Sequence, residues 1–589
     1  MKNKYHIGLN LGHNSSIAIV DNNQKLIFAT DIDRYTKISY DHGYYEDQIE
    51  RALHYLKIKK KDVLSVNFNQ VWIRDEKISD FTQRKLFPEA INKKKLNKIR
   101  TLDLTNLNKK KIINIQNKFE NITSNFDLNI CSHHACHAAS AAYTSNFKKK
   151  YIYVLDAFGD GINHSEWILE NGEMKNVILE ENYPNYPHMW ELISRVIFNE
   201  DRKDVGRKLN GYFPSKGPGK IMALAAKSDP KKKYILNLKE LFSDKKLYKI
   251  ELNNHKYLKQ KIFQKIGIKE KKFDWGSKDL LNIASALQFL TNEFIYNKIR
   301  YNKFKNISFA GGLALNCVAT SYASNKVNKR VYVPPFPGDS GISVGAAYLG
   351  KINNDKKNLI KNFFVKKKIN QRFTPYIGYS FNITSKEINN ILKRYSLNKL
   401  SFNIKKLSSI NAAKTIARHI NNKKIVAVFR GRAEFGPRAL CNRSILSNAF
   451  DKKTKSEINK LKYRENFRPV APSVLKDCSK KIFENILVDS PFMTQCQKIK
   501  YKFYDKLGGL NHYDFTARPQ LIEKYNIFMH NVLKNIKKQN GIGIVGNTSF
   551  NIKGPIVETP EDAIKTFVDS KINYLILNNF LIEKDVKTK

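Results

Sequence analysis

Residues 306–316, NISFAGGLALN, join a short apolar run to a double-glycine turn. The run 306–310 has the length and β-rich composition of a buried strand, and Gly311 and Gly312 stop it. Earlier in the chain, the apolar residues of 280–302 have helical spacing. A helix followed by a strand that ends in glycine is typical of α/β proteins, whose ligands bind at the ends of strands.

Other strands of this first region follow the same scheme. Residues 151–156 form a β-rich run that ends before Gly159-Asp160-Gly161, and 331–333 end before a turn rich in Pro and Gly. Two more runs, 6–20 and 26–30, flank a turn and predict a hairpin. We therefore expect an α/β domain here, with ligands at its strand ends.

A second α/β domain is predicted after residues 351–372, which are rich in Lys and Asn and lack periodicity. Its strand 425–429 runs into a basic turn, and a late strand at 543–545 runs into a turn of Gly, Asn, Thr and Ser. Residues 165–275 carry no clear pattern, and we find no internal repeat and no long linker. At 589 residues, the chain is long enough for two to four domains.

The formal net charge of +51 would suit a polyanionic partner. The charge is spread along the chain, however, and Asn and Ile are abundant beside Lys, as A/T-rich codons would produce. We expect no nucleic-acid partner, and a compositional origin and anionic substrates both remain open. Lysine triplets occur at 59–61, 93–95, 109–111, 148–150, 231–233 and 366–368.

Neither a membrane segment nor a secretory leader is expected. No apolar run approaches the roughly 18 residues that a membrane helix needs, and residues 1–20 mix apolar side chains with Asn, His and Ser. The six cysteines form no CxxC pair, so we expect reduced thiols in a cytoplasmic protein. They stand at positions 131, 136, 317, 441, 478 and 496.

Residues 132–142, SHHACHAASAA, are mostly small, which favours a tightly packed helix. His133 and His137 lie four apart and therefore share one face. Two imidazoles at this spacing can grip a metal ion, although the Glu of HExxH is missing and structural histidines would show the same pattern. A carboxylate from elsewhere would complete the site, and Asp339, in a turn after a strand, is the best candidate. Such a set suits Fe(II) or Zn(II) with open positions for a substrate oxygen.

Three glycine turns follow three strands of the first domain, and backbone N–H groups in such turns can bind phosphates. None matches GxxxxGK[ST] or GxGxxG, so each alone is also consistent with an ordinary turn. Their shared placement after three strands favours a nucleotide site. The turns are 10–16, 156–161 and 311–316.

The second domain carries basic residues beside Gly, Pro and Ser instead of in lysine runs. These rigid neighbours suit bidentate capture of phosphate or carboxylate by arginine, and a solvated charged face is the alternative. Polar residues at 547–551 add neutral donors. The candidates are Arg430, Arg432, Arg438, Arg443, Lys462, Arg464, Arg468 and Arg518, with Asn547 and Ser549.

Taken together, these segments resemble the carbamoyltransferase family of nodulation protein U and the tobramycin and cephem O-carbamoyltransferases, over nearly the whole chain. The shared order of these segments is specific. In the first domain the matches are the HxxxH helix, GKIMALA at 219–225, GGLALN at 311–316 and GDSG at 338–341. In the second they are GRAEFGPRAL at 431–440, RENFRP at 464–469, NTSFN at 547–551 and ETPEDA at 558–563.

The resemblance implies an actin/Hsp70-like (ASKHA) domain over 1–360, related to the enzyme that transfers threonylcarbamoyl to tRNA, and a YrdC-like domain over 373–589. In such enzymes the YrdC-like domain forms carbamoyl adenylate from carbamoyl phosphate and ATP, with Mg(II), and releases pyrophosphate. The first domain then transfers the carbamoyl group to a hydroxyl of a small-molecule or sugar acceptor. Adenylation gives the carbamate carbonyl a good leaving group, and shielding the intermediate from water is a reason to join two sites in one chain.

The resemblance also implies roles for individual residues. His13 would be the general base, since a neutral imidazole can take the acceptor's proton near pH 7, and a histidine satisfied within its turn is the alternative. His133, His137 and Asp339 would bind Fe(II), with Zn(II) as the second candidate. The basic series would hold carbamoyl phosphate and the ATP phosphates. The adenylate would contact Lys37, Asp156, Gly159, Asp160, Gly161, Gly311, Gly312 and Asn316.

Two positions depart from the family pattern. The family has a lysine followed by histidine where this chain has Ser39 and Tyr40, so either Lys37 replaces the adenylate-contacting lysine or that contact is absent. Cys441 stands where the family has Gly. The competing functions are a threonylcarbamoyl transferase acting on tRNA and a nucleotide-binding scaffold without catalysis. The acceptor is not readable from the sequence, and monomer and homodimer both remain open.

Overall fold

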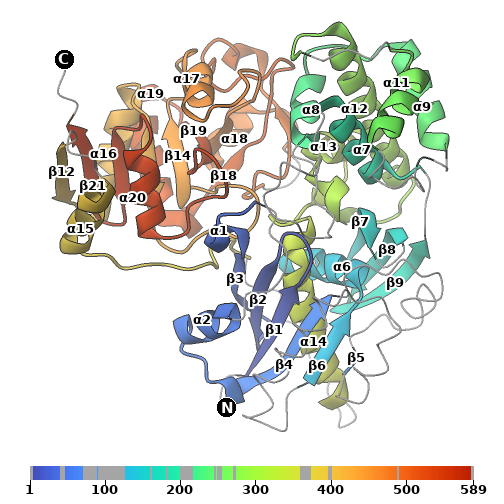
Figure 1. The fold of residues 1–589 in the computed structure, drawn as a ribbon, viewed down its shortest axis with the longest axis horizontal. Helices are drawn as coiled ribbons and strands as arrows, with labels where there is room; N and C mark the ends of the chain where they lie inside the picture. The colour runs from blue at the N-terminus through green and yellow to red at the C-terminus, as the bar shows by residue number, and fades with distance from the viewer. Residues whose placement is uncertain are drawn as a thin grey trace. The chain divides into compact units, whose positions relative to one another are not determined.

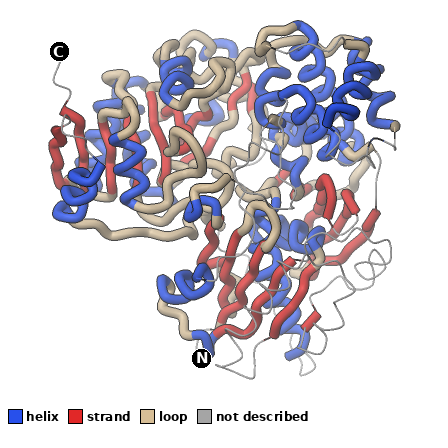
Figure 2. Tube along the Cα trace, viewed as in Figure 1, coloured by secondary structure: helices blue, strands red, loops and turns tan. Residues whose placement is uncertain are grey.

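The computed structural model describes residues 4–39, 47–69, 89–90, 127–159, 162–180, 184–198, 217–244, 247, 255–268, 274–358, 373–395, 401–486 and 490–585. The chain divides into two compact units, which we describe separately (Figure 1). The first unit is Met1–Ile32 with Tyr40–Phe373, and the second is Asp33–Ser39 with Thr374–Lys589. Both units are α/β, as predicted (Figure 2). In the described residues, no helix has the length and apolarity that a bilayer span requires.

The first unit contains two mixed sheets with the same topology. In each sheet, three strands form an antiparallel meander, and two further strands add in parallel beside the first strand of that meander. The order is β3-β2-β1-β4-β6 in one sheet, extended by a short β5, and β9-β8-β7-β10-β11 in the other. The unit thus repeats one strand topology, although the sequence shows no obvious internal repeat.

The strands of the first unit match most of the predicted runs. Their bounds are β1 (Tyr5–Asn10), β2 (Ser16–Asp21), β3 (Leu26–Asp31), β4 (Val63–Asn69), β5 (Glu89–Ala90), β6 (Asp127–Cys131), β7 (Lys150–Gly159), β8 (Ile162–Glu170), β9 (Glu173–Glu180), β10 (Asn306–Ala310) and β11 (Arg330–Tyr332). The predicted strand 306–310 is β10. The run 6–20 is not one strand, because the chain turns at Asn14, whose φ of 58° is left-handed.

The helices of this unit are α2 (Asp47–Tyr55), α6 (His133–Thr144), α7 (Tyr186–Phe198), α8 (Pro218–Ala225), α9 (Lys232–Ser243), α11 (His255–Ile266), α12 (Lys278–Ile299), α13 (Cys317–Val327) and α14 (Ile342–Asn358). The predicted helix at 280–302 is α12. Residues 165–275, where the sequence shows no clear pattern, contain most of β8, all of β9, and α7, α8, α9 and α11.

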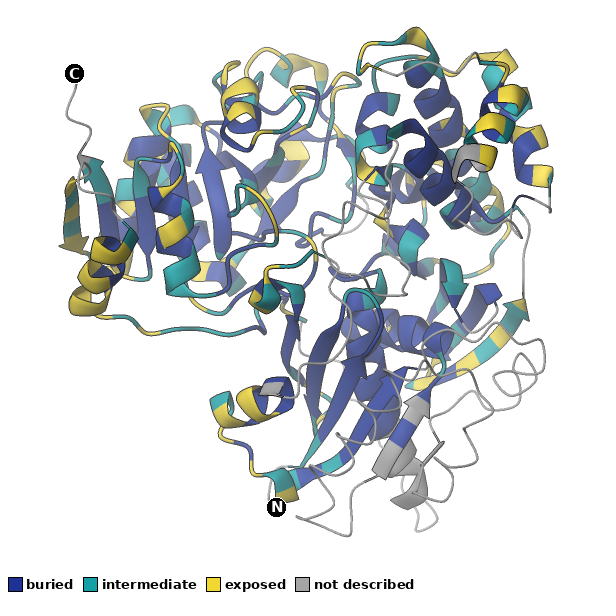
Figure 3. Ribbon diagram, viewed as in Figure 1, coloured by how far each residue is buried: buried dark blue, intermediate teal, exposed yellow. Residues whose placement is uncertain are grey.

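Helices α6 and α14 each follow the last parallel strand of their sheet and pack against one another. Glycines permit this close approach. A Cβ on Gly345 would lie 1.9 Å from the Cys136 carbonyl oxygen, and a Cβ on Gly8 would lie 1.9 Å from the Ser343 oxygen. Strands β1 and β2 and helix α6 are buried almost throughout (Figure 3). The start of α14 is therefore fixed against both α6 and β1.

The second unit is built on an eight-stranded mixed sheet. Its strands, in spatial order, are β12 (Ser401–Lys406), β21 (Phe580–Asp585), β20 (Tyr574–Leu577), β13 (Val426–Phe429), β14 (Arg443–Ser447), β19 (Ile544–Ser549), β15 (Ala471–Leu475) and β18 (Gln520–Ile522). A separate pair is β16 (Gln497–Lys498) and β17 (Thr516–Ala517). The helices are α1 (Asp33–Thr36), α15 (Ser385–Tyr395), α16 (Ser409–Asn421), α17 (Thr454–Leu461), α18 (Lys476–Ile482), α19 (Ile527–Asn540) and α20 (Pro560–Val568).

The segment Asp33–Ser39 belongs to this second unit, although the predicted first domain, 1–360, included it. Arg34 Nη2 donates to the Gly436 carbonyl at 2.9 Å, and Lys37 Nζ pairs with Asp562. These contacts tie the segment to the loop before β14 and to the start of α20. The actin/Hsp70-like and YrdC-like descriptions of the two units remain predictions.

Candidate active site

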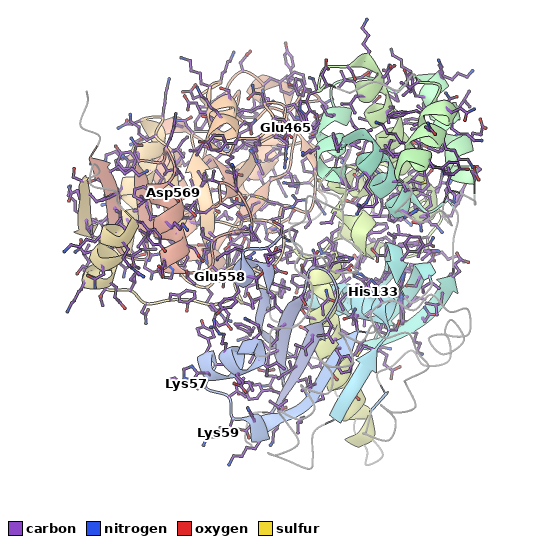
Figure 4. The ribbon with its side chains drawn as sticks, viewed as in Figure 1. Lys57, Lys59, His133, Glu465, Glu558 and Asp569 are labelled. Carbon is purple, nitrogen blue, oxygen red and sulfur yellow. The ribbon has the colours of Figure 1, made fainter. Side chains whose placement is uncertain are left out.

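Two histidines and two aspartates of the first unit place their side chains around one point. One potential ligand atom from each of His133, His137, Asp156 and Asp339 lies within 4.8 Å of the others. The Nε2 atoms of His133 and His137 are 3.1 Å apart. Asp156 Oδ2 lies 3.1 Å from His133 Nε2, and Asp339 Oδ1 lies 3.6 Å from His137 Nε2. We call these four residues the His/Asp cluster; Figure 4 labels His133.

The two histidines are placed by the start of α6. The Ser132 hydroxyl accepts a hydrogen bond from the Ala135 N–H, so the helix begins at His133 and the next turn presents His137 on the same face. The His133 ring packs over Gly159, where a Cβ would lie 2.4 Å from His133 Cδ2. Glycine at this position therefore leaves the room that the imidazole needs.

The two aspartates come from two different places in the topology: Asp156 lies on β7, and Asp339 lies after β11. Asp156 lies near the end of β7, and its Oδ1 accepts from the Gly312 N–H at 2.7 Å. Gly311 has a φ of 86°, and a Cβ there would lie 2.4 Å from the Leu155 carbonyl oxygen, so this turn requires glycine. Asp339 lies in a single 3-10 turn directly before α14.

Opposite charges lower the pKa of both carboxyl groups. Burial alone would raise the pKa of Asp156, but the hydrogen bond from His133 and the charges of His137 and His133 bring it below its ordinary value. Burial would likewise raise the pKa of Asp339, and the charge of His13 and the hydrogen bond from His137 outweigh it. Both aspartates are therefore carboxylates at neutral pH.

His13 joins the cluster through the outer oxygen of Asp339. Its Nε2 lies 3.0 Å from Asp339 Oδ2, while Asp339 Oδ1 faces the two cluster histidines. The side chains of His13 and Asp339 are 17% and 12% exposed, whereas that of His137 is fully buried. A substrate can therefore approach the cluster from the side of His13.

Asn10, which we did not predict, positions this part of the site. Its buried Nδ2 donates to three carbonyl oxygens, those of His13 at 2.9 Å, Asn14 at 3.1 Å and Asp339 at 3.0 Å. One amide thus joins the turn that carries His13 to the turn that carries Asp339. The signal available in the sequence was a polar residue at the end of an apolar strand, two residues before Gly12 and three before His13.

The donor set of the His/Asp cluster fits a metal ion. Two imidazole nitrogens and two carboxylate oxygens suit Fe(II) or Zn(II), and both carboxylates have their second oxygen held by a hydrogen-bond donor. Asp156, expected to face the adenylate, is placed as a fourth potential ligand. Among the other predicted adenylate contacts, Gly159, Gly311 and Gly312 border the cluster.

Four residues of that predicted set remain. The Asn316 side chain accepts from the Ala319 N–H at 3.0 Å and caps α13. Lys37 belongs to the second unit, where its Nζ pairs with Asp562, and its predicted contact with the adenylate stays a prediction. Asp160 and Gly161 fall outside the described residues.

In the second unit, three arginines predicted to bind phosphate donate hydrogen bonds to neighbouring segments of the chain. Arg430 donates to the Asn578 carbonyl at 2.7 Å and to Ser409 Oγ at 2.9 Å. Arg432 donates to the carbonyls of Gly378 and Ile377. Arg443 is fully buried and donates to four carbonyl oxygens, including those of Arg430 and Tyr379. Their guanidinium groups hold backbone in this structure, and their predicted contact with phosphate stays a prediction.

Four of the five remaining basic residues form a group that we call the cationic cluster: Lys462, Arg464, Arg468 and Arg518. Burial and the charges of Arg464 and Arg468 hold the pKa of Lys462 well below its ordinary value. Burial, then the charge of Arg468, lowers the pKa of Arg464 to about 9. Glu465 Oε2 pairs with the group, at 3.6 Å from Arg468 Nη1 (Figure 4 labels Glu465).

The cationic cluster has unused donors. Lys462 Nζ donates to Ser549 O at 2.6 Å, Ser549 Oγ at 3.0 Å and Asn551 Oδ1 at 2.7 Å, all neutral acceptors. Arg464 Nη2 and Arg518 Nε are buried and meet no acceptor among the described residues. Crowded cations with unused N–H groups indicate a site for an anion.

The other candidates of the second unit divide between this cluster and the core. Ser549 contacts the cationic cluster, because its Oγ accepts a hydrogen bond from Lys462 Nζ. Asn547 is buried, and its Nδ2 donates to Ser473 Oγ at 3.0 Å in a polar network that also contains Cys441. Arg438 lies half-buried in the loop before β14.

Comparison with known proteins identifies the family. A family model described as Carbamoyltransferase N-terminus matches residues 6–348, and one described as Carbamoyltransferase C-terminus matches residues 417–584. The chain belongs to the carbamoyltransferase family. This carbamoyltransferase is 30% identical to an uncharacterized protein of Methanocaldococcus jannaschii over 98% of both chains.

Two relatives with informative names are also similar to this carbamoyltransferase. Nodulation protein NolO of Bradyrhizobium diazoefficiens is 26% identical over 77% of this chain and 79% of that protein. The 3'-hydroxymethylcephem-O-carbamoyltransferase of Amycolatopsis lactamdurans is 36% identical over 132 residues, which are 22% of this chain and 25% of that enzyme. These findings make the chain an enzyme of the carbamoyltransferase class.

Proposed function

We propose that the chain is an ATP-dependent O-carbamoyltransferase that works in two steps, one in each unit. The second unit forms carbamoyl adenylate from carbamoyl phosphate and ATP. The first unit then transfers the carbamoyl group to a hydroxyl of a small-molecule or sugar acceptor. The observation that carries the proposal is the cationic cluster. In a carbamoyltransferase, neighbouring cations whose buried N–H groups lack acceptors can bind the phosphates of two anionic substrates.

The adenylation step joins two reactants that repel one another. Carbamoyl phosphate and water give carbamate and inorganic phosphate, and a carbamate oxygen then attacks the α-phosphorus of ATP. The bond from that phosphorus to the oxygen of the β-phosphate breaks, which releases pyrophosphate. The cationic cluster, with Mg(II) on ATP, would offset the repulsion, since fixed cations in a buried place cost no reorganisation during the reaction.

The transfer step requires a base on the open side of the His/Asp cluster. The acceptor oxygen attacks the carbonyl carbon, its proton goes to the imidazole of His13, and AMP leaves with the electrons of the broken C–O bond. Asp339 Oδ2, at 3.0 Å from His13, orients the ring and stabilises its protonated form. Asn10 holds the His13 and Asp339 turns together during this proton transfer.

The His/Asp cluster would hold Fe(II), with Zn(II) as the second candidate, through the Nε2 atoms of the histidines and the carboxylates of Asp156 and Asp339. A bound metal ion would supply Lewis-acid polarisation of the adenylate's carbonyl or phosphoryl oxygen. The chain itself fixes the two carboxylates, because the Gly312 N–H and His13 each hold the oxygen that a metal would not use.

The name of one relative supports a hydroxyl as the acceptor. The Amycolatopsis lactamdurans enzyme is named for 3'-hydroxymethylcephem, which offers a hydroxyl group. We extend only this chemical class to the present chain.

Metal analysis tests the transfer site. After chelation and anaerobic repletion, the wild-type protein is expected to bind one Fe(II) per chain. His137→Ala should weaken that binding by more than about 100-fold, because losing even an outer partner of a metal ligand costs about 10- to 100-fold. His54→Ala, at an exposed position of α2, is the matched control and should bind as the wild type does.

Pyrophosphate release by His137→Ala should remain at the wild-type rate, because the cationic cluster belongs to the other unit. If His137→Ala still bound stoichiometric Fe(II), or if the wild type bound neither Fe(II) nor Zn(II), the metal assignment would be wrong.

A further inference from the structure

Tyr463 stands in a backbone conformation that a large side chain rarely adopts. Helix α17 ends in a Schellman motif, in which the Tyr463 N–H donates to the Lys460 carbonyl at 3.2 Å and the Arg464 N–H donates to the Asn459 carbonyl at 3.0 Å. The residue in the left-handed position of this motif is usually Gly and sometimes Asn. Here it is Tyr463, with φ of 48°. The helix end alone would be more stable with glycine.

Packing does not explain the tyrosine. Tyr463 is 74% exposed, so its ring gains little from burial. The residues on either side of it, Lys462 and Arg464, belong to the cationic cluster and are directed inward. The motif thus directs the side chains of Lys462 and Arg464 into the unit and leaves the Tyr463 ring at the surface between them. A residue in a strained backbone conformation, next to a buried N–H group that has no acceptor among the described residues, suggests a contact with a ligand.

A second segment of the chain connects the ring to the same site. Lys553 Nζ lies 5.6 Å from the centroid of the Tyr463 ring. Lys553 is two residues beyond Asn551, whose Oδ1 accepts from Lys462 Nζ. The loop after β19 therefore contacts both the buried lysine and the exposed ring, and these two features border one site.

We propose that Tyr463 is a stacking platform for the nucleobase of ATP, with Lys553 beside it and the ATP phosphates on the cationic cluster. This assignment rests on the proposed function of the second unit. An aromatic ring next to buried cations matches the two halves of a nucleotide, an aromatic base and a polyanion. Stacking on a tyrosine face accepts any purine, so the platform should favour a nucleotide over bare phosphate without selecting strongly between ATP and GTP.

Calorimetric titration of the full chain with ATP and with inorganic triphosphate separates the base from the phosphates. Tyr463→Ala should weaken ATP binding by about 5- to 100-fold, the range for loss of one stacked base. Triphosphate should bind this variant and the wild type with the same Kd. Tyr463→Phe keeps the ring and should retain wild-type affinity for ATP. Tyr501→Ala removes another exposed tyrosine of the same unit and should change neither Kd.

Tyr463→Gly distinguishes a ligand contact from a structural role. It should weaken ATP binding as Tyr463→Ala does, yet raise the Tm of the ligand-free protein, because glycine adopts the left-handed conformation without strain. Equal loss of ATP and triphosphate affinity in Tyr463→Ala would overturn the platform, and so would unchanged ATP binding. A wild-type protein that bound neither compound would overturn the proposed adenylation site together with it.

Discussion

Lys462→Met will reduce pyrophosphate release from ATP and carbamoyl phosphate by about 10²- to 10³-fold, the usual cost of removing one pre-positioned electrostatic group. Methionine keeps the length of the side chain and removes its charge. Lys462 has a large effect because it is buried, holds the end of β19 through Ser549, and stands among other cations that have few acceptors. Pyrophosphate should be measured in the full chain under saturating substrates.

A control and a pH series accompany this variant. Lys460→Met, at an exposed position in the last turn of α17, should release pyrophosphate at the wild-type rate.

The lowered pKa values of Lys462 and Arg464 mean that the folded state binds these protons less tightly than the unfolded chain. The resulting cost to folding is present at neutral pH and falls as pH rises toward the ordinary values, so stability should increase in that direction.

Phosphate should weaken this pH dependence in the wild type, because a bound anion stabilises the protonated cations. Wild-type pyrophosphate release by Lys462→Met would show that the cationic cluster is not the adenylation site.

His13→Asn will slow the transfer step by about 10²- to 10⁴-fold, the contribution of a general base. Asparagine can still reach Asp339 by a hydrogen bond, but it cannot take a proton. With water in place of the acceptor hydroxyl, single-turnover quench experiments on the Fe(II)-repleted protein would follow the conversion of carbamoyl adenylate to AMP. Pyrophosphate should form at the normal rate while AMP formation lags and carbamoyl adenylate accumulates.

His54→Asn again provides a surface control and should show no lag. The base assignment fails if His13→Asn forms AMP as fast as the wild type. A simultaneous loss of pyrophosphate release would instead mean that the substitution disturbs more than the transfer step.

The local parts of the site were predictable from the sequence because they follow from periodicity. The spacing of His133 and His137 places both on one helical face, and Gly311 marks a strand end where a side chain cannot fit. Asp339 is more than two hundred residues from His133 in the sequence, and its candidacy depended on its turn after a strand. The topology brings it to the start of α6 because α6 and α14 close equivalent halves of the first unit.

The basic residues show where local reasoning is insufficient. Arg443 donates from Nη1 and Nη2 to backbone carbonyls, whereas Arg464 Nη2 meets no acceptor among the described residues. The difference depends on which distant segments place a carbonyl oxygen beside each guanidinium group. For Arg443, one such oxygen is the carbonyl of Tyr379. Periodicity carries no information on that point, and the same holds for Lys37, whose partner Asp562 follows it by more than five hundred residues.

Release of pyrophosphate from ATP tests the central claim most directly. The full chain, supplied with Mg(II)-ATP and carbamoyl phosphate, should release pyrophosphate and inorganic phosphate in equal amounts and form carbamoyl adenylate detectable by mass. Omission of carbamoyl phosphate should abolish the release. A well-folded protein that released no pyrophosphate, or that formed ADP instead, would contradict adenylation and with it the two-step reaction proposed for this chain.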